Sequence, residues 1–295
     1  MTAPARSTTP VATDGSARGR WPVLLAVVLL AAGLVVGVRL LTAPPEGAGP
    51  AVPSAAPVPA LVVGDDRTVT MISLDGARTD ALLARVGANI GAAVASVEAF
   101  WGTDWSHQIL MVATGTEAEF AAQAGRGTAA GADIAAVAVA DRVDPARGLA
   151  TGQRIVLAPG AAKMTDAALR IVLAHELFHY ASRATTALDA PRWLTEGVAD
   201  YVGRPATPVP PELDLPTALP SDADFAVDGP ALSLAYDRAW LFARFVADEY
   251  GAPTLRELYQ RACGPGHTDV PAALGETLGA GPDEVLARWR QWLAQ

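Results

Sequence analysis

Cysteine and histidine are scarce in this chain of 295 residues, which contains one Cys and four His. The single cysteine, Cys263, cannot form an intramolecular disulfide, so the fold must be stabilised by its hydrophobic core. The sequence also lacks an internal repeat, a glycine-rich phosphate-binding loop and a G-x-S-x-G nucleophile elbow. These absences argue against a repeat protein, a P-loop nucleotide-binding protein and an α/β-hydrolase.

Positive charge is also in deficit, because the chain has 22 Lys and Arg against 31 Asp and Glu. Four of the basic and two of the acidic residues lie in the first 60 positions, which leaves residues 61–295 with a net charge of −11. Such an acidic region is not expected to bind nucleic acid or an anionic lipid surface. Cys263 and His267 are possible metal ligands, but two such residues across a Gly-Pro-Gly loop do not predict a metal site.

The first 60 residues do not show the pattern of a folded domain. Residues 1–20 are rich in Ala, Thr, Ser, Arg and Pro without a hydrophobic period, and we expect a disordered tail. Residues 21–41 are apolar apart from Arg39, and as a helix of about 30 Å they are long enough to cross a bilayer. Residues 42–60 contain six prolines among alanines, which predicts a semi-rigid extended linker.

Basic residues predict the orientation of the apolar segment. Arg6, Arg18 and Arg20 precede it against one acid, Asp14, which favours a cytoplasmic N-terminus. Residues 61–295 would then form an extracytoplasmic domain, held at the cytoplasmic membrane by a single-pass anchor. A cleavable signal peptide is the alternative, although the apolar run is longer than a typical signal core.

The most informative motif of the chain is HELFH at positions 175–179. His175 and His179 are four residues apart, so on a helix they lie on one face and both imidazoles can bind one metal ion. Glu176 between them can accept a proton from a water molecule that the metal activates. The motif therefore predicts two zinc ligands and a general base, with a helix carrying two ordinary surface histidines as the alternative.

A catalytic zinc ion usually has three protein ligands, so a third one is expected. The metzincin pattern would place glycine and histidine where this chain has Ser182 and Thr185, which excludes that class. The segment PRWLTEGVADY at 191–201 predicts a second helix behind a proline and offers Glu196 as the third ligand. Asp200, one turn later, either accepts the ring N–H of a ligating histidine or is a solvated carboxylate.

HELFH followed by WLTEGVADY resembles the gluzincin branch of the zinc metallopeptidases, and in particular the bacterial peptidase MA-like domains. The resemblance covers residues 105–295 and includes YDRAW at 236–240, at the expected start of an apolar helix. It implies a catalytic base at Glu176 and one Zn²⁺ per chain, with three ligands: His175, His179 and Glu196. Some gluzincins stabilise the oxyanion with a tyrosine, for which Tyr236 is the candidate; a core-facing aromatic is the alternative.

The remaining pattern predicts an α+β fold of the zincin type, with a small N-terminal sheet, a central active-site helix and a helical C-terminal half. Strands are expected at 61–63, 68–73, 107–113, 134–140 and 154–157, and helices from an N-cap at Thr79 to residue 100 and from Thr116 to residue 123. Thr165 is the expected N-cap of the motif helix, 166–182, whose histidine-bearing side would face a cleft. Residues 203–230 predict a long loop that borders this cleft.

These observations lead to the hypothesis of a membrane-anchored zinc metallopeptidase that acts on peptide or protein substrates outside the cytoplasm. Two alternatives remain open. One is a non-catalytic zincin-like scaffold that binds a partner, and the other is a zinc hydrolase of a non-peptide amide or ester. The presence of both histidines and both glutamates favours an enzyme over the scaffold.

Overall fold

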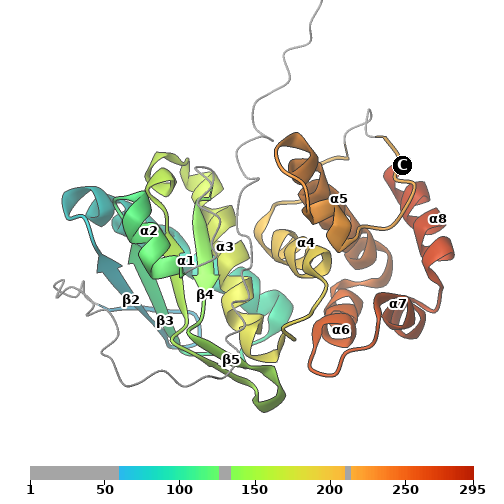
Figure 1. Cartoon of the computed structure of the whole chain (residues 1–295), viewed down its shortest axis with the longest axis horizontal. Coiled ribbons are helices and arrows are strands. Elements are labelled where there is room, and N and C mark those ends of the chain that lie inside the picture. The colour runs from blue at the N-terminus through green and yellow to red at the C-terminus, as the bar shows by residue number, and fades with distance from the viewer. Residues whose placement is uncertain (1–59, 126–133, 210–213) are drawn as a thin grey trace, which may run out of the picture.

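The computed structural model describes residues 60–125, 134–209 and 214–295. These residues form a mixed α+β fold, with a sheet and the first three helices in one half and five further helices in the other (Figure 1). The α+β class predicted from the sequence is confirmed. The predicted tail, the predicted membrane segment and the linker up to residue 59 lie outside the described residues.

The main sheet is mixed and has the strand order β1-β2-β3-β7-β4. Its three central strands run parallel, and the two edge strands are antiparallel to their neighbours. The strands are β1 (Leu61–Val63), β2 (Arg67–Ser73), β3 (Gln108–Ala113), β4 (Ala136–Val139) and β7 (Arg154–Leu157). All were predicted to within two residues, because each is a short run rich in apolar or β-branched residues. A separate hairpin, β5 (Arg142–Asp144) with β6 (Leu149–Thr151), was not predicted.

Helices cover both faces of the main sheet. Alternate residues of its strands point to opposite sides, so neighbouring residues of one strand pack against different helices. On one face, Ile155 of β7 joins the main core with α1 (Ala77–Trp101) and α3 (Asp166–Ser182). On the other, Val156 packs with Phe120 of α2 (Glu117–Ala124), which begins with a capping box formed by Thr116 and Glu119. The β4 edge of this buried sheet contacts α3.

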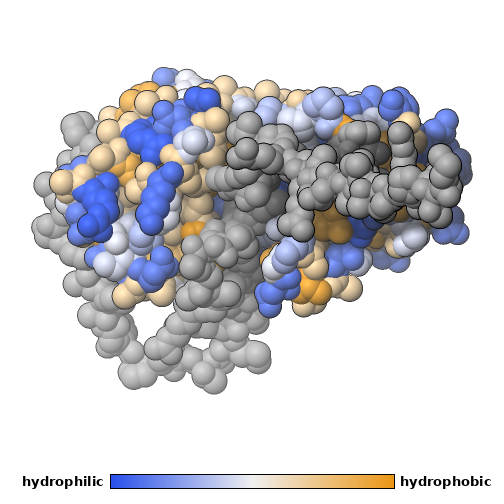
Figure 2. Space-filling model, turned by 90° about the horizontal axis from the view of Figure 1, so that it is seen from above, coloured by the Kyte–Doolittle hydropathy of each residue, from blue (hydrophilic) through white to orange (hydrophobic). Residues whose placement is uncertain are grey.

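Among the described helices, α1 is long and apolar enough to cross a membrane by length and composition. Its residues Leu83, Val86, Ile90, Val94 and Val97 are nevertheless buried, and they pack in the core against α3 and the sheet. The apolar character of α1 is therefore explained by its place in the core. On the face seen in Figure 2, the described surface mixes hydrophilic and hydrophobic residues.

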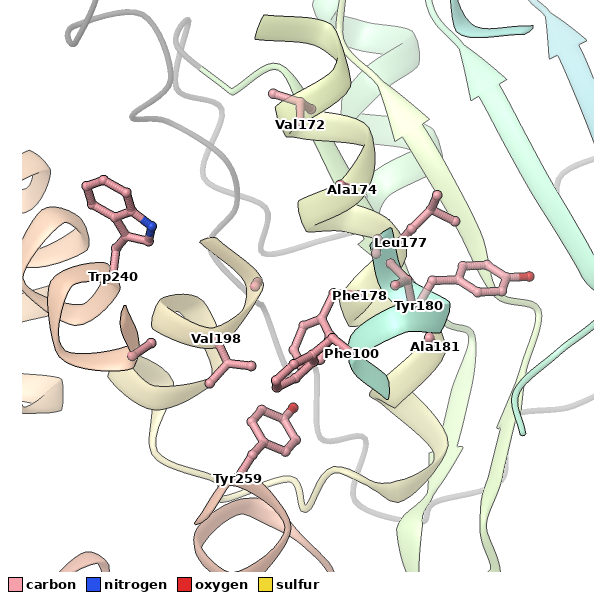
Figure 3. Close-up of a cluster of buried hydrophobic side chains, with 14 of the residues drawn as sticks. Phe100, Val172, Ala174, Leu177, Phe178, Tyr180, Ala181, Val198, Trp240 and Tyr259 are labelled. Carbon is pink, nitrogen blue, oxygen red and sulfur yellow. The ribbon is translucent and has the colours of Figure 1, made fainter. Parts of the chain in front are cut away.

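The C-terminal half is helical, as predicted. Its helices are α4 (Arg192–Gly203), α5 (Pro230–Tyr250), α6 (Ala252–Cys263), α7 (Val270–Leu278) and α8 (Pro282–Leu293). Aromatic side chains join this half to the sheet half. The ring of Phe178 in α3 lies edge-on to Tyr259 of α6, with centroids 5.3 Å apart, and Phe100 of α1 packs beside them near Val198 of α4 (Figure 3).

Two predicted helix starts are wrong. Helix α1 begins two residues before Thr79, after Gly76 with a φ of 55°, and the Thr79 hydroxyl donates a hydrogen bond to the carbonyl of Gly76 instead of capping the helix. The helix that carries Tyr236 begins at Pro230, so that Tyr236 lies in its second turn. Proline at the first helical position accounts for this earlier start, because its fixed φ suits a helix and its missing N–H is not needed there.

The connection between α4 and α5 is long, as predicted, and its described part is tied to both helices. Within it, Asp222–Phe225 form a 3-10 turn. The Asp222 carboxylate accepts a hydrogen bond from the backbone N–H of Trp193 at 2.9 Å, which satisfies an otherwise unpaired donor in the first turn of α4. Phe225 is buried edge-on to Tyr236 of α5, with ring centroids 4.9 Å apart.

Candidate metal centre

The three predicted ligands converge from two helices. α3 begins at its predicted N-cap, Thr165, and its register places His175 and His179 one turn apart with their Nε2 atoms 3.1 Å from each other. Glu196 of α4 supplies the third ligand atom. Its Oε2 lies 3.3 Å from Nε2 of His175 and 3.6 Å from Nε2 of His179.

These atoms have the spacing that a tetrahedral zinc site requires. Bonds of about 2.0–2.1 Å at tetrahedral angles place neighbouring ligand atoms about 3.3 Å apart, and the observed separations are 3.1, 3.3 and 3.6 Å. Both oxygens of Glu196 are buried, and neither receives a hydrogen bond of normal geometry. Burying a carboxylate in this way is costly, and a cation bound at this point would remove the cost. Among the described residues, these three form the one group of potential metal ligands.

Two glycines allow α4 to approach its neighbours closely enough to form this site. A Cβ atom on Gly203 would lie 2.8 Å from the carbonyl oxygen of Ile171 in α3, and one on Gly197 would lie 2.6 Å from that of Ala239 in α5. Real Cβ atoms essentially never make contacts this short with backbone. Glycine at both positions therefore permits the α3–α4–α5 packing that brings Glu196 to the histidines.

Asp200 is not a solvated carboxylate, because it is only 3% exposed. Its Oδ1 lies 2.9 Å from Nδ1 of His175. When Nδ1 donates its proton to Asp200, Nε2 of His175 keeps a lone pair that can bind a metal ion. The structure therefore supports the first of the two readings of Asp200.

In the metal-free protein, the imidazole of His175 keeps its proton over a wide range of pH. Burial lowers the pKa of His175, but the hydrogen bond with Asp200 and the nearby carboxylate of Glu196 outweigh it and raise the pKa to about 10. Burial raises the pKa of Glu196, but the adjacent histidines outweigh it and lower the pKa to about 2. The site thus offers an ionised carboxylate and an imidazole whose proton a metal ion must displace.

Glu176 lies on α3 beside the ligands and is fully buried. Its Oε2 accepts a hydrogen bond from the backbone N–H of Ala138 in β4 at 2.7 Å, whereas its Oε1 has no hydrogen-bond partner. Burial raises the pKa of Glu176 and outweighs the nearby histidines, which lower it. A carboxyl group with a raised pKa and an unpaired oxygen is suited to accept and return a proton.

The predicted cleft is not open at these residues. His175, His179 and Glu196 are 2%, 5% and 0% exposed. This side of α3 is covered by β4 and by α4, which contact it through the backbone N–H of Ala138 and through Glu196. A cavity of about 10 Å³ lies next to His179, which is room for about one water molecule.

Tyr236 is both core-facing and close to the candidate site. It is 3% exposed, packs against Phe225, and its hydroxyl accepts a hydrogen bond from Nη2 of Arg192 at 3.3 Å. Burial raises the pKa of Tyr236, and the negative charge of Glu196 raises it further. The hydroxyl therefore stays protonated and can donate a hydrogen bond.

Several polar groups beside the site were not predicted. The guanidinium of Arg204 lies 2.7 Å from Oδ2 of Asp200 and donates to Asp237 of α5 at 2.8 Å. Arg204 gave a signal in the sequence, because a basic residue four positions after an acidic one on a helix commonly pairs with it. The hydrogen bond from Ala138 to Glu176 gave no signal in the sequence, since a backbone N–H makes it. Arg192, which contacts Tyr236, gave none either, because the pair comes from two different helices.

Comparison with protein-family models, with curated proteins and with solved structures gave no significant match to this chain.

Proposed function

We propose that this protein is a zinc-dependent metallopeptidase of the gluzincin type, with a zincin-like domain over residues 61–295. The observation that carries the proposal is the buried convergence of His175, His179 and Glu196, whose ligand atoms lie within 4.8 Å of one another. Glu176 with its unpaired oxygen lies beside them. The order of elements adds support, because the strands of the main sheet precede the helix with both histidines and the helix with the third ligand follows it, as expected for a zincin-type fold.

The ligand chemistry fits zinc. Two imidazole nitrogens and a carboxylate oxygen are typical zinc ligands, whereas magnesium and calcium prefer oxygen ligands alone. The described residues supply three ligands rather than four, as in catalytic rather than structural zinc sites. Zinc bound here would supply a Lewis acid that polarises the scissile carbonyl and lowers the pKa of a water molecule.

Glu176 would act first as general base and then as general acid. Its carboxylate takes a proton from water while the water oxygen bonds to the carbonyl carbon, and it returns that proton to the amine nitrogen as the C–N bond breaks. The raised pKa of Glu176 favours the return of the proton. Asp200 would hold His175 in the ligating tautomer, and Tyr236, whose hydroxyl stays protonated, is the candidate donor of a hydrogen bond to the oxyanion of the tetrahedral intermediate.

A second candidate is a non-catalytic zincin-like scaffold that binds a metal ion and a partner. The burial of Glu176, which is 0% exposed, favours this candidate, because a general base must meet the substrate. Hydrolysis of a non-peptide amide or ester would use the same residues as peptide hydrolysis and is the third candidate.

We further propose that residues 21–41 anchor the protein in the cytoplasmic membrane. Residues 42–60 would act as a spacer, and the catalytic domain would meet peptide or protein substrates outside the cytoplasm. The uncharged length of the segment and the preceding arginines support this arrangement. A cleaved signal peptide remains the alternative.

Metal content and hydrolysis of a peptide library, measured on the same samples, test the proposed function. We expect the wild type to bind one zinc ion per chain and to hydrolyse peptides. Glu176→Gln should keep the zinc and lose hydrolysis, because the amide cannot accept the proton, whereas His179→Ala should lose both. Glu117→Gln on α2 and His267→Ala, which replace exposed or half-buried residues outside the site, are matched controls.

The outcomes separate the candidates. Zinc binding without hydrolysis of peptides, amides or esters by the wild type would favour the scaffold. Hydrolysis of amides or esters but not peptides would favour the third candidate. Full peptidase activity in Glu176→Gln would remove Glu176 from the mechanism, and wild-type zinc content in His179→Ala would remove the proposed ligand set.

A further inference from the structure

Four side chains form a chain of contacts that begins at the candidate metal centre and runs through three helices. Nδ1 of His175 lies 2.9 Å from Oδ1 of Asp200, and Oδ2 of Asp200 lies 2.7 Å from Nη2 of Arg204. Nη1 of Arg204 donates to Oδ1 of Asp237 at 2.8 Å. The contacts link α3, the C-terminal end of α4 and α5.

The two oxygens of Asp200 thus have different partners, His175 and Arg204. The contact with Arg204 is an ion pair that lacks the geometry of a hydrogen bond. A carboxylate can turn about its Cβ–Cγ bond, so a charged partner at one oxygen favours one orientation of the plane in which the other oxygen meets the imidazole. The side chains of Asp200 and Arg204 are only 4% and 8% exposed, so their ion pair is shielded from water. Charges interact more strongly in such an environment than at a surface.

Arg204 is also held on its far side. Asp237 accepts its hydrogen bond, and the guanidinium carbon of Arg204 lies 5.2 Å from the ring centroid of Trp240. Turning Arg204 into solvent would break two ion pairs and a cation–π contact. The guanidinium is therefore a fixed partner for Asp200 rather than a mobile surface charge.

We propose that Arg204, supported by Asp237, is a positioning residue for the metal ligand His175 and acts through Asp200. The inference rests on the metal site of the proposed function. By fixing the Asp200 carboxylate, Arg204 keeps the His175 ring turned so that Nε2 faces the other two ligand atoms. Outer partners of metal-bound histidines typically contribute about 10–100-fold to metal affinity.

The chain contains a matched arginine that separates positioning from packing. Arg244 of α5 also lies over Trp240, 5.1 Å from the ring centroid, but its Nη1 donates to the carbonyl oxygen of Thr207. If Arg204 served only to pack on Trp240, the variants Arg204→Gln and Arg244→Gln would behave alike. Under the proposal, only Arg204→Gln disturbs the metal ligand.

Zinc affinity of the metal-free full-length protein tests the proposal, measured by competition with a chromophoric chelator. We expect Arg204→Gln to weaken zinc binding about tenfold, the lower end of the range for a direct partner of a ligating histidine, because Arg204 acts one contact further out, and Asp237→Asn to weaken it less. Arg244→Gln should match the wild type. Arg204→Lys keeps the charge without the planar fork, so it should lie in between. The visible spectrum of the Co²⁺-loaded protein reports ligand geometry and should change in Arg204→Gln but not in Arg244→Gln.

Wild-type zinc affinity together with a wild-type cobalt spectrum in Arg204→Gln would overturn the positioning role while leaving the metal site intact. Equal losses in Arg204→Gln and Arg244→Gln would overturn it as well, in favour of packing. If Arg204→Gln does not fold, wild-type affinity in both Asp237→Asn and Arg204→Lys would be the overturning result. A wild-type protein that binds no zinc would overturn the proposed function and this inference together.

Discussion

The carboxylate of Glu176 and the backbone N–H of Ala138 are 2.7 Å apart, and their hydrogen bond ties α3 to the free edge of β4. Just before β4, the carbonyl oxygen of Ala135 accepts a hydrogen bond from Ala158 at the end of β7. Backbone groups alternate in direction along an antiparallel strand, so Ala138 points away from β7. The edge strand β4 therefore donates a hydrogen bond to Glu176, the proposed base, without losing a hydrogen bond to β7.

Replacing Ala138 by proline removes this N–H but no hydrogen bond between β4 and β7. General bases contribute about 10²–10⁴-fold to rates, and we expect loss of orientation to reduce kcat about tenfold with zinc content unchanged. Ala138→Gly keeps the N–H and should remain near the wild type. Peptide hydrolysis and zinc content are measured on all three proteins. A wild-type kcat in the proline variant would show that this bond does not orient Glu176.

Zinc binding should release a proton from His175 even at pH values well above the ordinary pKa of histidine. His175 in the metal-free protein has its pKa raised from 6.5 to about 10, so at pH 8 its proton is still bound. Zinc must displace that proton, and its affinity should therefore rise with pH until about pH 10. Titration calorimetry in buffers of different ionisation enthalpy at pH 8 measures the protons released, and we expect at least one, from His175, in addition to any proton lost by a zinc-bound water molecule.

Asp200→Asn provides the control for this titration. The amide cannot act as the anionic partner that raises the pKa of His175, so the variant should release fewer protons at pH 8. If the wild type released none, the imidazole would already be deprotonated, and the described pairing of His175 with Asp200 would have no effect on its titration.

Residues 21–41 should decide where the protein is found in the cell. We expect the full chain to remain with membranes after alkaline extraction, and a chain starting at residue 61 to be released into the soluble fraction. Replacing Leu29 and Leu30 by arginine should have the same effect, because charges at the centre of the segment oppose insertion. Mature protein that lacks its N-terminal peptide would instead identify a cleaved signal peptide.

The sequence was most informative where one local rule decides the structure. The helix over 166–182 was predicted with its N-cap and both ends, because Thr165 meets the cap rule and the apolar period is unbroken. The spacing of His175 and His179 predicted their common face in the same way. Glu196 was predicted from the number of ligands that zinc requires. No local pattern could show how close its carboxylate would come to the two histidines.

Tertiary contacts account for what the sequence did not reveal. The burial of Glu176 depends on β4, which lies 38 positions earlier in the chain at its point of contact. A hydrogen bond from a backbone N–H, such as that of Ala138, can be made by almost any residue type, so the sequence does not indicate it. The start of α5 at Pro230 was missed because the Pro- and Asp-rich segment before it suggested a continuous loop. Long-range packing decided the burial of Glu176 and its contact with Ala138, whereas the start of α5 follows from a local rule, proline at the first helical position.

Gly197 shows how such packing can be tested, since it follows the ligand Glu196 directly. A methyl group at Gly197 would lie 2.6 Å from the carbonyl oxygen of Ala239, which belongs to the backbone of α5 and cannot turn aside. Gly197→Ala must therefore push α4 away from α5. We expect the free energy of unfolding to fall by about 1–3 kcal/mol, as is typical of overpacking. Zinc affinity should fall with it, because Glu196 moves with α4.

Gly275 in α7 is the matched control, because a Cβ atom there would have nothing within 4 Å. Alanine is the better helix former, so Gly275→Ala should raise the free energy of unfolding by about 0.5–1 kcal/mol and leave zinc affinity unchanged. Urea unfolding of the zinc-free proteins and chelator competition measure the two quantities separately. If Gly197→Ala were as stable as Gly275→Ala and bound zinc equally well, α4 would not need its close approach to α5, and the position of Glu196 would have to be explained by its contact with α3 alone.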